Sequence, residues 1–242
     1  YGFDNILIES LEYMPFRHGY HHEVFGVPVN PLIDFFMSLS FSPGIYKKAA
    51  EQGIDLDKVR NFVKVKCEEA FNNPFSQQPT MSWEEIRNAA DGQMGAYLDL
   101  RENLLADLMK EIKEVISANS KAMVSALDFG PLYGLGPSET SWQNGVNLEK
   151  HVPYLDQIHP TFYFTDPEVL KAKVAEYFGV IAKLSKPVEI VPAIRAILPQ
   201  VGSQEDLRVQ ISCLRDRCSS FTFYNYGFMA YEVLEWIGRE SK

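Results

Sequence analysis

Short apolar runs rich in β-forming residues alternate with helical patterns along the chain, and this alternation limits the fold more than any other feature. The runs predict strands over residues 4–9, 121–129, 155–164, 187–198 and 221–226. Parallel strands need crossover connections, which are usually helical and right-handed. The sequence therefore predicts an α/β protein with a parallel sheet.

Two α/β architectures fit this order of elements: a doubly wound sheet and a (β/α)8 TIM-type barrel. No G-x-G-x-x-G or G-x-x-x-x-G-K-[ST] motif follows any of the runs, which disfavours the nucleotide-binding forms of the doubly wound sheet. The predicted strands instead end in polar, charged or aromatic residues, as strands do at the active-site face of a barrel. We expect a partial barrel of about five β/α units, forming a single domain over 1–242 with a helical insert over about 31–80.

The composition and charge of the chain argue against several classes of function. The net charge of −9 argues against binding to a nucleic-acid backbone, which needs a basic face. No stretch approaches the ~18 apolar residues of a membrane-spanning helix. Cys67, Cys213 and Cys218 form neither a C-x-x-C metal pattern nor a disulfide framework. We expect no cofactor, and a bound metal only in the alternative interpretation of the first loop described below.

Two loops are the segments most suited to binding a ligand. The first, residues 13–23, follows carboxylates at Glu9 and Glu12 and is crowded with rings, histidines and an arginine. The second, residues 130–145, is long for a compact domain, which favours a functional role. The first loop also allows a metal-dependent hydrolase that uses His18 and His22, although neighbouring histidines seldom converge on a metal without a distant ligand.

Several segments resemble known barrels. Residues 2–13 resemble the fourth strand of glycosidase-like TIM barrels, and Asp156 to Tyr163 resembles their sixth. Phe223 to Gly227 is similar to the eighth strand, and the stretch from Ala49 to Arg60 is similar to a helical insert after strand four. The chain thus resembles uncharacterised glycosyl-hydrolase-like TIM-barrel proteins from strand four to strand eight, which is nearly its whole length.

The resemblance implies a glycoside-hydrolase-like enzyme whose carboxylates lie at the ends of barrel strands. Glu9 falls where amylase-like barrels carry a nucleophilic aspartate, and Asp128 ends the strand that would carry the acid. Hydrolysis of a glycosidic bond generally needs such a pair across the sugar. The chain departs from the pattern at Glu12, where arginine is common, and at Arg195, near where many glycosidases carry a glutamate. Glu12 is a third catalytic candidate.

The remaining candidates are substrate contacts. Aromatic side chains can stack on sugar faces, and polar ones can bind hydroxyl groups. The strand residues among them could equally fill a barrel interior, and Arg195 could pair with a carboxylate of the site. A carbohydrate-binding or scaffold protein on a degenerate, non-catalytic barrel is therefore the alternative function. The candidates are Arg17, His18, Tyr20, His22, Tyr133, Trp142, Tyr163, Arg195, Tyr224 and Asn225.

Half of a barrel would expose two sheet edges and much apolar surface. We therefore expect either a homo-oligomer or an N-terminal barrel segment that completes the fold. The start of the sequence carries no signal-like stretch. The compartment stays open, and carbohydrate processing favours a secreted or periplasmic location.

Overall fold

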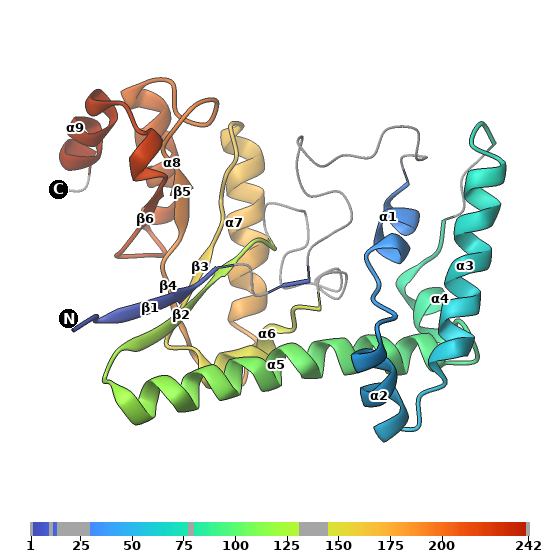
Figure 1. The fold of residues 1–242 in the computed structure, drawn as a ribbon. Helices are drawn as coiled ribbons and strands as arrows, with labels where there is room; N and C mark the ends of the chain where they lie inside the picture. The colour runs from blue at the N-terminus through green and yellow to red at the C-terminus, as the bar shows by residue number, and fades with distance from the viewer. Residues whose placement is uncertain (1, 10–11, 14–29, 77–79, 131–144, 241–242) are drawn as a thin grey trace. The chain divides into compact units, whose positions relative to one another are not determined.

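The structure is a computed structural model that describes residues 2–9, 12–13, 30–76, 80–130 and 145–240 (Figure 1). The chain divides into two compact units. The sheet unit comprises Tyr1–Leu11, Leu108–Ser141 and Asn147–Lys242, and the helical unit comprises Glu12–Asp107 and Trp142–Val146. The single domain predicted from the sequence stays a prediction.

The strands of the sheet unit are all parallel to their neighbours. Four of them form one sheet in chain order: β1 (Asn5–Ile8), β2 (Met123–Asp128), β3 (Gln157–Pro160) and β4 (Glu189–Ile190). A second pair consists of β5 (Ala193–Arg195) and β6 (Thr222–Tyr224). A parallel bridge between Thr161 and Ala193 sets β5 beside the residue that follows β3. Within the four-stranded sheet each strand therefore pairs with its successor in the sequence, and β5 pairs with β6.

These strands confirm the five predicted runs, with shorter bounds, and confirm the α/β class. The run 187–198 forms two short strands instead of one, because β4 ends before Val191 and Pro192. Proline has no N–H group to donate to a strand ladder, so the ladder is interrupted there. The barrel itself stays a prediction.

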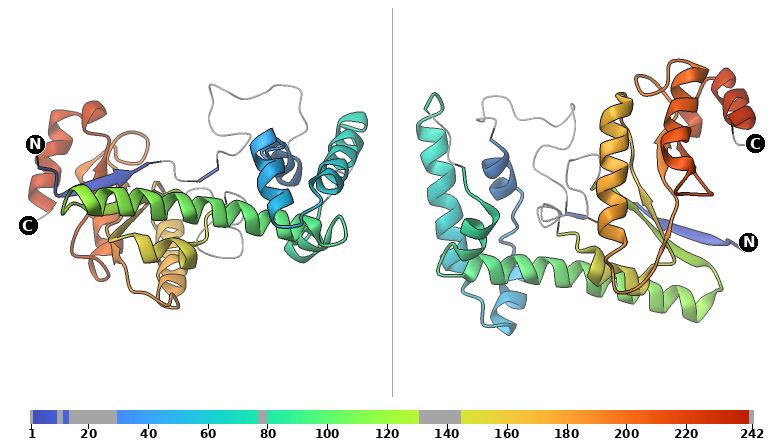
Figure 2. Two further views of the ribbon diagram at one scale, coloured as in Figure 1. Left: turned by 60° about the horizontal axis from the view of Figure 1, so that its bottom comes forward. Right: turned by 180° about the vertical axis from the view of Figure 1, so that it is seen from behind.

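Helices of the sheet unit begin at the residues that local signals predict. Asp166 caps α7 by accepting hydrogen bonds from the backbone N–H groups of Glu168 and Val169, with proline at the first helical position. Ser203 caps the next long helix in the same way. α7 and α8 lie side by side (Figure 2). The helices are α6 (Leu148–His151), η2 (Val152–Tyr154), α7 (Pro167–Ile181), α8 (Gln204–Arg215), η3 (Tyr226–Phe228) and α9 (Tyr231–Glu240).

The two faces of the sheet differ sharply, because successive strand residues point to opposite sides. On the helix-covered face, Phe162 is fully buried and meets Tyr177 of α7 edge-on, with ring centroids 5.7 Å apart. On the polar face, Asn5 donates a hydrogen bond to Gln157 at 2.7 Å, and Gln157 donates one to Glu189 at 2.8 Å. One face thus packs against helices, while the other presents hydrogen-bonding groups.

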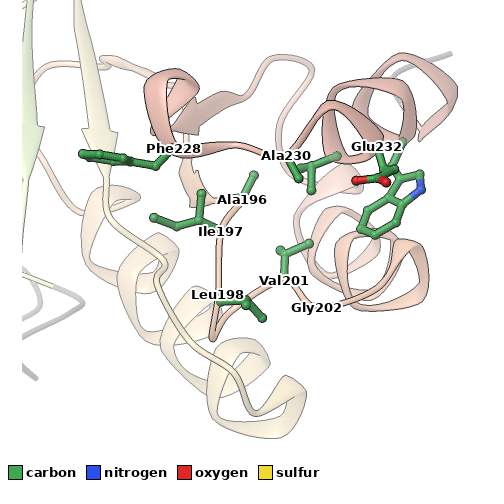
Figure 3. A pocket seen from close by; sticks show the side chains of 10 residues that line it. Ala196, Ile197, Leu198, Val201, Gly202, Phe228, Ala230 and Glu232 are labelled. Carbon is green, nitrogen blue, oxygen red and sulfur yellow. The ribbon is translucent and has the colours of Figure 1, made fainter.

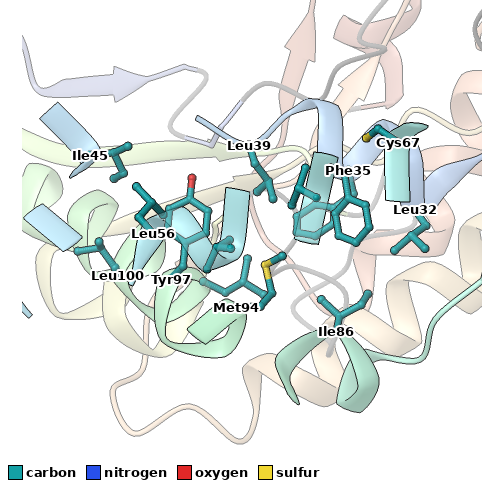
Figure 4. Packing of buried hydrophobic residues seen from close by; sticks show 14 of the residues in the cluster. Leu32, Phe35, Leu39, Ile45, Leu56, Cys67, Ile86, Met94, Tyr97 and Leu100 are labelled. Atoms are coloured by element: carbon teal, nitrogen blue, oxygen red, sulfur yellow. The ribbon is translucent and has the colours of Figure 1, made fainter. Parts of the chain in front are cut away.

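The helical unit has its own apolar core, part of which Figure 4 displays. Fully buried side chains from different helices meet there, including Ile33, Phe36, Val59 and Tyr97. The helices of this unit are α1 (Pro31–Met37), α2 (Pro43–Glu51), α3 (Leu56–Asn72), α4 (Trp83–Asn88) and the first part of α5 (Gln93–Asn119). The first three confirm the helical segment predicted over about 31–80, whereas α4 and α5 lie beyond it.

The residues from Ser82 to Glu85 have the sequence pattern of a capping box, and the structure forms one. The Ser82 hydroxyl accepts a hydrogen bond from the backbone of Glu85, and the Glu85 carboxylate accepts one from the backbone of Ser82. Ala90, Asp91 and Gly92 then have positive φ angles and separate the short α4 from the long α5.

No helix among the described ranges is long and apolar enough to cross a membrane.

Candidate functional site

Four side chains gather at the C-terminal ends of the parallel strands, on the polar face. The rings of Tyr163 and Tyr224 stack with centroids 5.8 Å apart and planes tilted by 26°. Tyr163 also packs with Leu127 and Ala193 in a small apolar cluster. Together with Glu9 and Arg195, these tyrosines form what we call the edge cluster. Two of the aromatic residues predicted to stack on a sugar are therefore in contact with each other.

The charges of Glu9 and Arg195 act on the Tyr163 hydroxyl of this stack. Burial is the main cause that raises the pKa of the Tyr163 hydroxyl; Tyr224 and Glu9 raise it further, and Arg195 lowers it. Tyr163 is buried, whereas Glu9 is exposed and Tyr224 retains 38% of its surface. The Nε atom of Arg195 is buried and has no hydrogen-bond partner within the described residues. The edge cluster thus combines an accessible carboxylate and ring with an arginine donor that is not engaged.

Asp128 does not belong to the edge cluster. Its carboxylate accepts hydrogen bonds from the Tyr177 hydroxyl at 2.8 Å and from the Gly130 backbone at 2.9 Å. Leu127 takes the neighbouring polar-face position, so Asp128 points toward α7 on the helix-covered face. The charge of Glu9 instead raises the pKa of the Tyr163 hydroxyl, which lies on the polar face. The two carboxylates therefore do not form the pair predicted from the sequence.

His159 is a polar-face residue that the sequence analysis missed. The residue is 94% buried, and Nδ1 lies 3.0 Å from the hydroxyl of Thr222. Nε2 is buried without a hydrogen-bond partner in the part of the chain that is described. Burial lowers the pKa of His159, and Glu189 opposes this shift. The available signal was the alternate spacing of His159, Thr161 and Tyr163, which places all three on one face of a strand.

Other predicted residues lie elsewhere. Asn225 accepts a hydrogen bond from the backbone of Gly227 at 3.0 Å, which is a turn-capping role. Glu12 is buried and belongs to the helical unit, not to the unit that holds Glu9. Arg17, His18, Tyr20, His22, Tyr133 and Trp142 lie outside the described residues.

The described residues contain no group of three or more metal-ligating side chains that could hold an ion. The metal-dependent hydrolase considered above depends on His18 and His22, both outside the described ranges. The hypothesis of a metal site in that loop therefore stays untested.

A pocket of about 440 Å³ lies beside the C-terminal ends of β5 and β6 (Figure 3). Its walls are mainly apolar, with the carboxylate of Glu232 and the indole of Trp236 contributed by α9. No predicted site residue lines it. The signal that could have found it was the apolar run that continues beyond Arg195 to Leu198. The lining residues are Ala196, Ile197, Leu198, Val201, Gly202, Phe228, Ala230, Glu232, Val233 and Trp236.

No protein-family model matches the chain, and neither a curated protein nor a solved structure matches it. The class of the protein is therefore stated from its own structure: it is an α/β protein with a four-stranded parallel sheet.

Proposed function

We propose that the sheet unit is the strand-four to strand-eight part of a TIM-type barrel and acts on carbohydrate as a glycoside-hydrolase-like enzyme. The observation that carries this proposal is the edge cluster. A tyrosine stack flanked by an accessible carboxylate and an arginine occupies the C-terminal ends of parallel strands, where barrel enzymes hold their active sites.

The order of the strands supports a barrel over a doubly wound sheet. In a doubly wound sheet the strand order reverses at a switch point, and helices cover both faces. Here the order β1-β2-β3-β4 follows the sequence without reversal, and the polar face carries a row of hydrogen-bonded side chains. In a barrel, the polar face would turn inward and its upper end would meet the substrate.

The chemistry of the edge cluster suits a sugar. Tyr224 offers a partly exposed ring on which the C–H face of a sugar can stack. The Nε atom of Arg195 is buried beside the stack without a hydrogen-bond partner among the described residues, and the arginine charge acts on the Tyr163 hydroxyl. Glu9 is the carboxylate placed to act as nucleophile or base. Because Asp128 faces away, the second carboxyl of a glycosidase mechanism would come from outside the edge cluster.

A carbohydrate-binding or scaffold protein without catalysis is the second candidate. The sequestration of Asp128 by Tyr177 and Gly130 favours it, since only Glu9 then remains of the predicted carboxylate pair. This alternative keeps the same sugar-contacting surface, so the two candidates differ in turnover and not in the place of binding.

Replacement of Glu9 by glutamine separates these candidates. We expect Glu9→Gln to lower kcat/KM on a cleaved glycoside by about 100-fold or more, as removal of an acid–base or nucleophilic carboxylate does. The measurement is a screen of aryl glycosides followed by steady-state kinetics. Glu189→Gln is the matched control, because Glu189 is another exposed carboxylate on a sheet strand and lies at the opposite end.

Unchanged turnover in Glu9→Gln would exclude Glu9 as the catalytic carboxylate. Saturable binding of sugars without any turnover would select the binding protein. Failure of every glycoside both to bind and to react would count against either form of the proposal.

Exposed apolar side chains at both ends of the strand order support a partner polypeptide. Phe3 and Leu7 at β1 retain 72% and 45% of their surface, and Tyr226 and Phe228 after β6 retain 75% and 74%. Unpaired edges of this kind favour pairing with further strands. We expect light scattering to report a species larger than 27.6 kDa for the purified chain. A monodisperse monomer would contradict a partner supplied by a second copy.

A further inference from the structure

The helical unit buries an arginine whose two terminal guanidinium nitrogens have no hydrogen-bond partner among the described residues. Arg101 of α5 is 98% buried and is the largest of the fully buried residues in the described part of the chain. Neither of its terminal guanidinium nitrogens has an acceptor among the residues that the structure describes. A buried charge without hydrogen bonds is costly, so this arginine destabilises the fold unless something engages its donors.

Aromatic rings occupy the faces of the guanidinium but leave its N–H groups unsatisfied. The ring of Tyr13 lies 4.4 Å from the guanidinium carbon, and that of Phe35 lies 6.0 Å away. Stacking of this kind interacts with the flat face, whereas the five N–H donors point outward in the plane. The Tyr97 hydroxyl donates to the backbone oxygen of Ser40 at 2.7 Å and accepts no hydrogen bond from the two terminal nitrogens of Arg101.

The buried carboxylate of Glu102 lies near enough to interact with the Arg101 charge, but no hydrogen bond joins it to the two terminal nitrogens. A planar fork of N–H groups matches a pair of oxygen atoms on one anion, such as a carboxylate or a phosphate. The unsatisfied donors of Arg101 therefore define the chemistry of the missing partner.

Tyr13 covers this cation and is only loosely tied to it. Its ring is half-buried, and its hydroxyl donates to the backbone oxygen of Arg101 at 3.5 Å, at the limit of a hydrogen bond. On the other side, the ring packs against Gly145, where an added Cβ would lie 2.6 Å from a ring carbon. Tyr13 thus lies between the glycine and the guanidinium, with one long hydrogen bond holding its hydroxyl.

We propose that Arg101 is the recognition group of an anion-binding site, which accepts the paired oxygens of a carboxylate or phosphate when the ring of Tyr13 turns aside. This site belongs to the helical unit and does not rest on the proposed carbohydrate function. In a chain of net charge −9, a specific buried arginine provides the local attraction that the whole molecule lacks.

Calorimetric titration of the full chain with inorganic phosphate, and separately with malonate, tests this proposal at a fixed ionic strength set with sodium chloride. We expect saturable binding of at least one of the two anions. Binding of phosphate alone indicates a phosphorylated ligand, and binding of malonate alone indicates a carboxylate. Saturable binding of neither anion overturns the proposal.

The matched variants are Arg101→Met and Arg87→Met. Arg101→Met should raise the Kd of the bound anion at least tenfold, whereas Arg87→Met should leave it unchanged because Arg87 already pairs with Asp99. An equal Kd in Arg101→Met and the original chain overturns the proposal. If Arg101→Met fails to fold by circular dichroism, Arg101→Lys replaces it. That variant keeps the charge but loses the fork, so equal affinity there is also a refutation.

Discussion

Alanine in place of Phe162 is expected to lower the free energy of unfolding by about 3–5 kcal/mol, the usual loss for a buried phenylalanine. Phe162 is fully buried and packs edge-on against Tyr177 of α7. Its removal leaves a cavity between the sheet and the helix that holds the covered face. Urea denaturation followed by circular dichroism measures the loss.

Tyr224→Ala is the matched control for this variant. Tyr224 is an aromatic residue of the same sheet unit, but it lies on the polar face with 38% of its surface exposed. We expect a loss of stability well below that of Phe162→Ala, together with weakened sugar binding if the proposed function holds. Similar losses in the two variants would contradict the assignment of the two faces.

The second large effect is expected for Asp128→Ala. The substitution leaves the Tyr177 hydroxyl and the Gly130 N–H buried without their acceptor. Each unsatisfied group costs about 1–3 kcal/mol, so the combined loss should rival that of Phe162→Ala. Tyr177→Phe is the control, because it removes the hydroxyl and leaves Asp128 with the Gly130 contact. If Asp128→Ala is no less stable than Tyr177→Phe, the buried network does not stabilise the fold as described.

Asp128 also predicts a pH dependence of stability. Burial raises its pKa in the folded chain, although the bonds from Gly130 and Tyr177 oppose the shift. The folded state therefore holds the proton more tightly than the unfolded state, in which the pKa is about 3.9. The contribution to stability is complete below that value and falls as pH rises toward the folded pKa. Asp128→Asn should remove this fall, as urea denaturation at a series of pH values would reveal. An identical pH profile in the variant would refute the assignment.

Local signals in the sequence predicted the secondary structure well. The Asp166-Pro167 start of α7 and the Ser82 capping box depend on contacts within four residues, so the sequence alone contains them. The strands follow from β-forming runs that are bounded by polar residues. The break at Ala90 to Gly92 is harder to predict, because two of its three positive-φ residues are not glycine.

The face to which each candidate points could not be predicted in the same way. All residues from Val124 to Asp128 are buried, so the strand lacks the alternation of exposed and buried positions that would reveal its faces. Phe162 and Tyr163 are neighbouring aromatic residues, so the sequence does not show which of them lies on the helix-covered face. Their assignment depends on pairing between strands distant in the sequence, which is why Asp128 was placed with Glu9. The division into two units was hidden for a related reason, since α5 belongs to both of them.

The row of polar side chains across the sheet has a direction. The Ser125 hydroxyl donates to Asn5, the Asn5 amide donates to Gln157, and the Gln157 amide donates to the carboxylate of Glu189. Because a carboxylate accepts hydrogen bonds and donates none, Glu189 fixes the orientation of the Gln157 amide, which in turn fixes that of the Asn5 amide. A slip of one residue that puts Ile6 in place of Asn5, or Ile158 in place of Gln157, would interrupt this series of hydrogen bonds. The row of hydrogen bonds therefore favours the observed register of the strands over a shifted one.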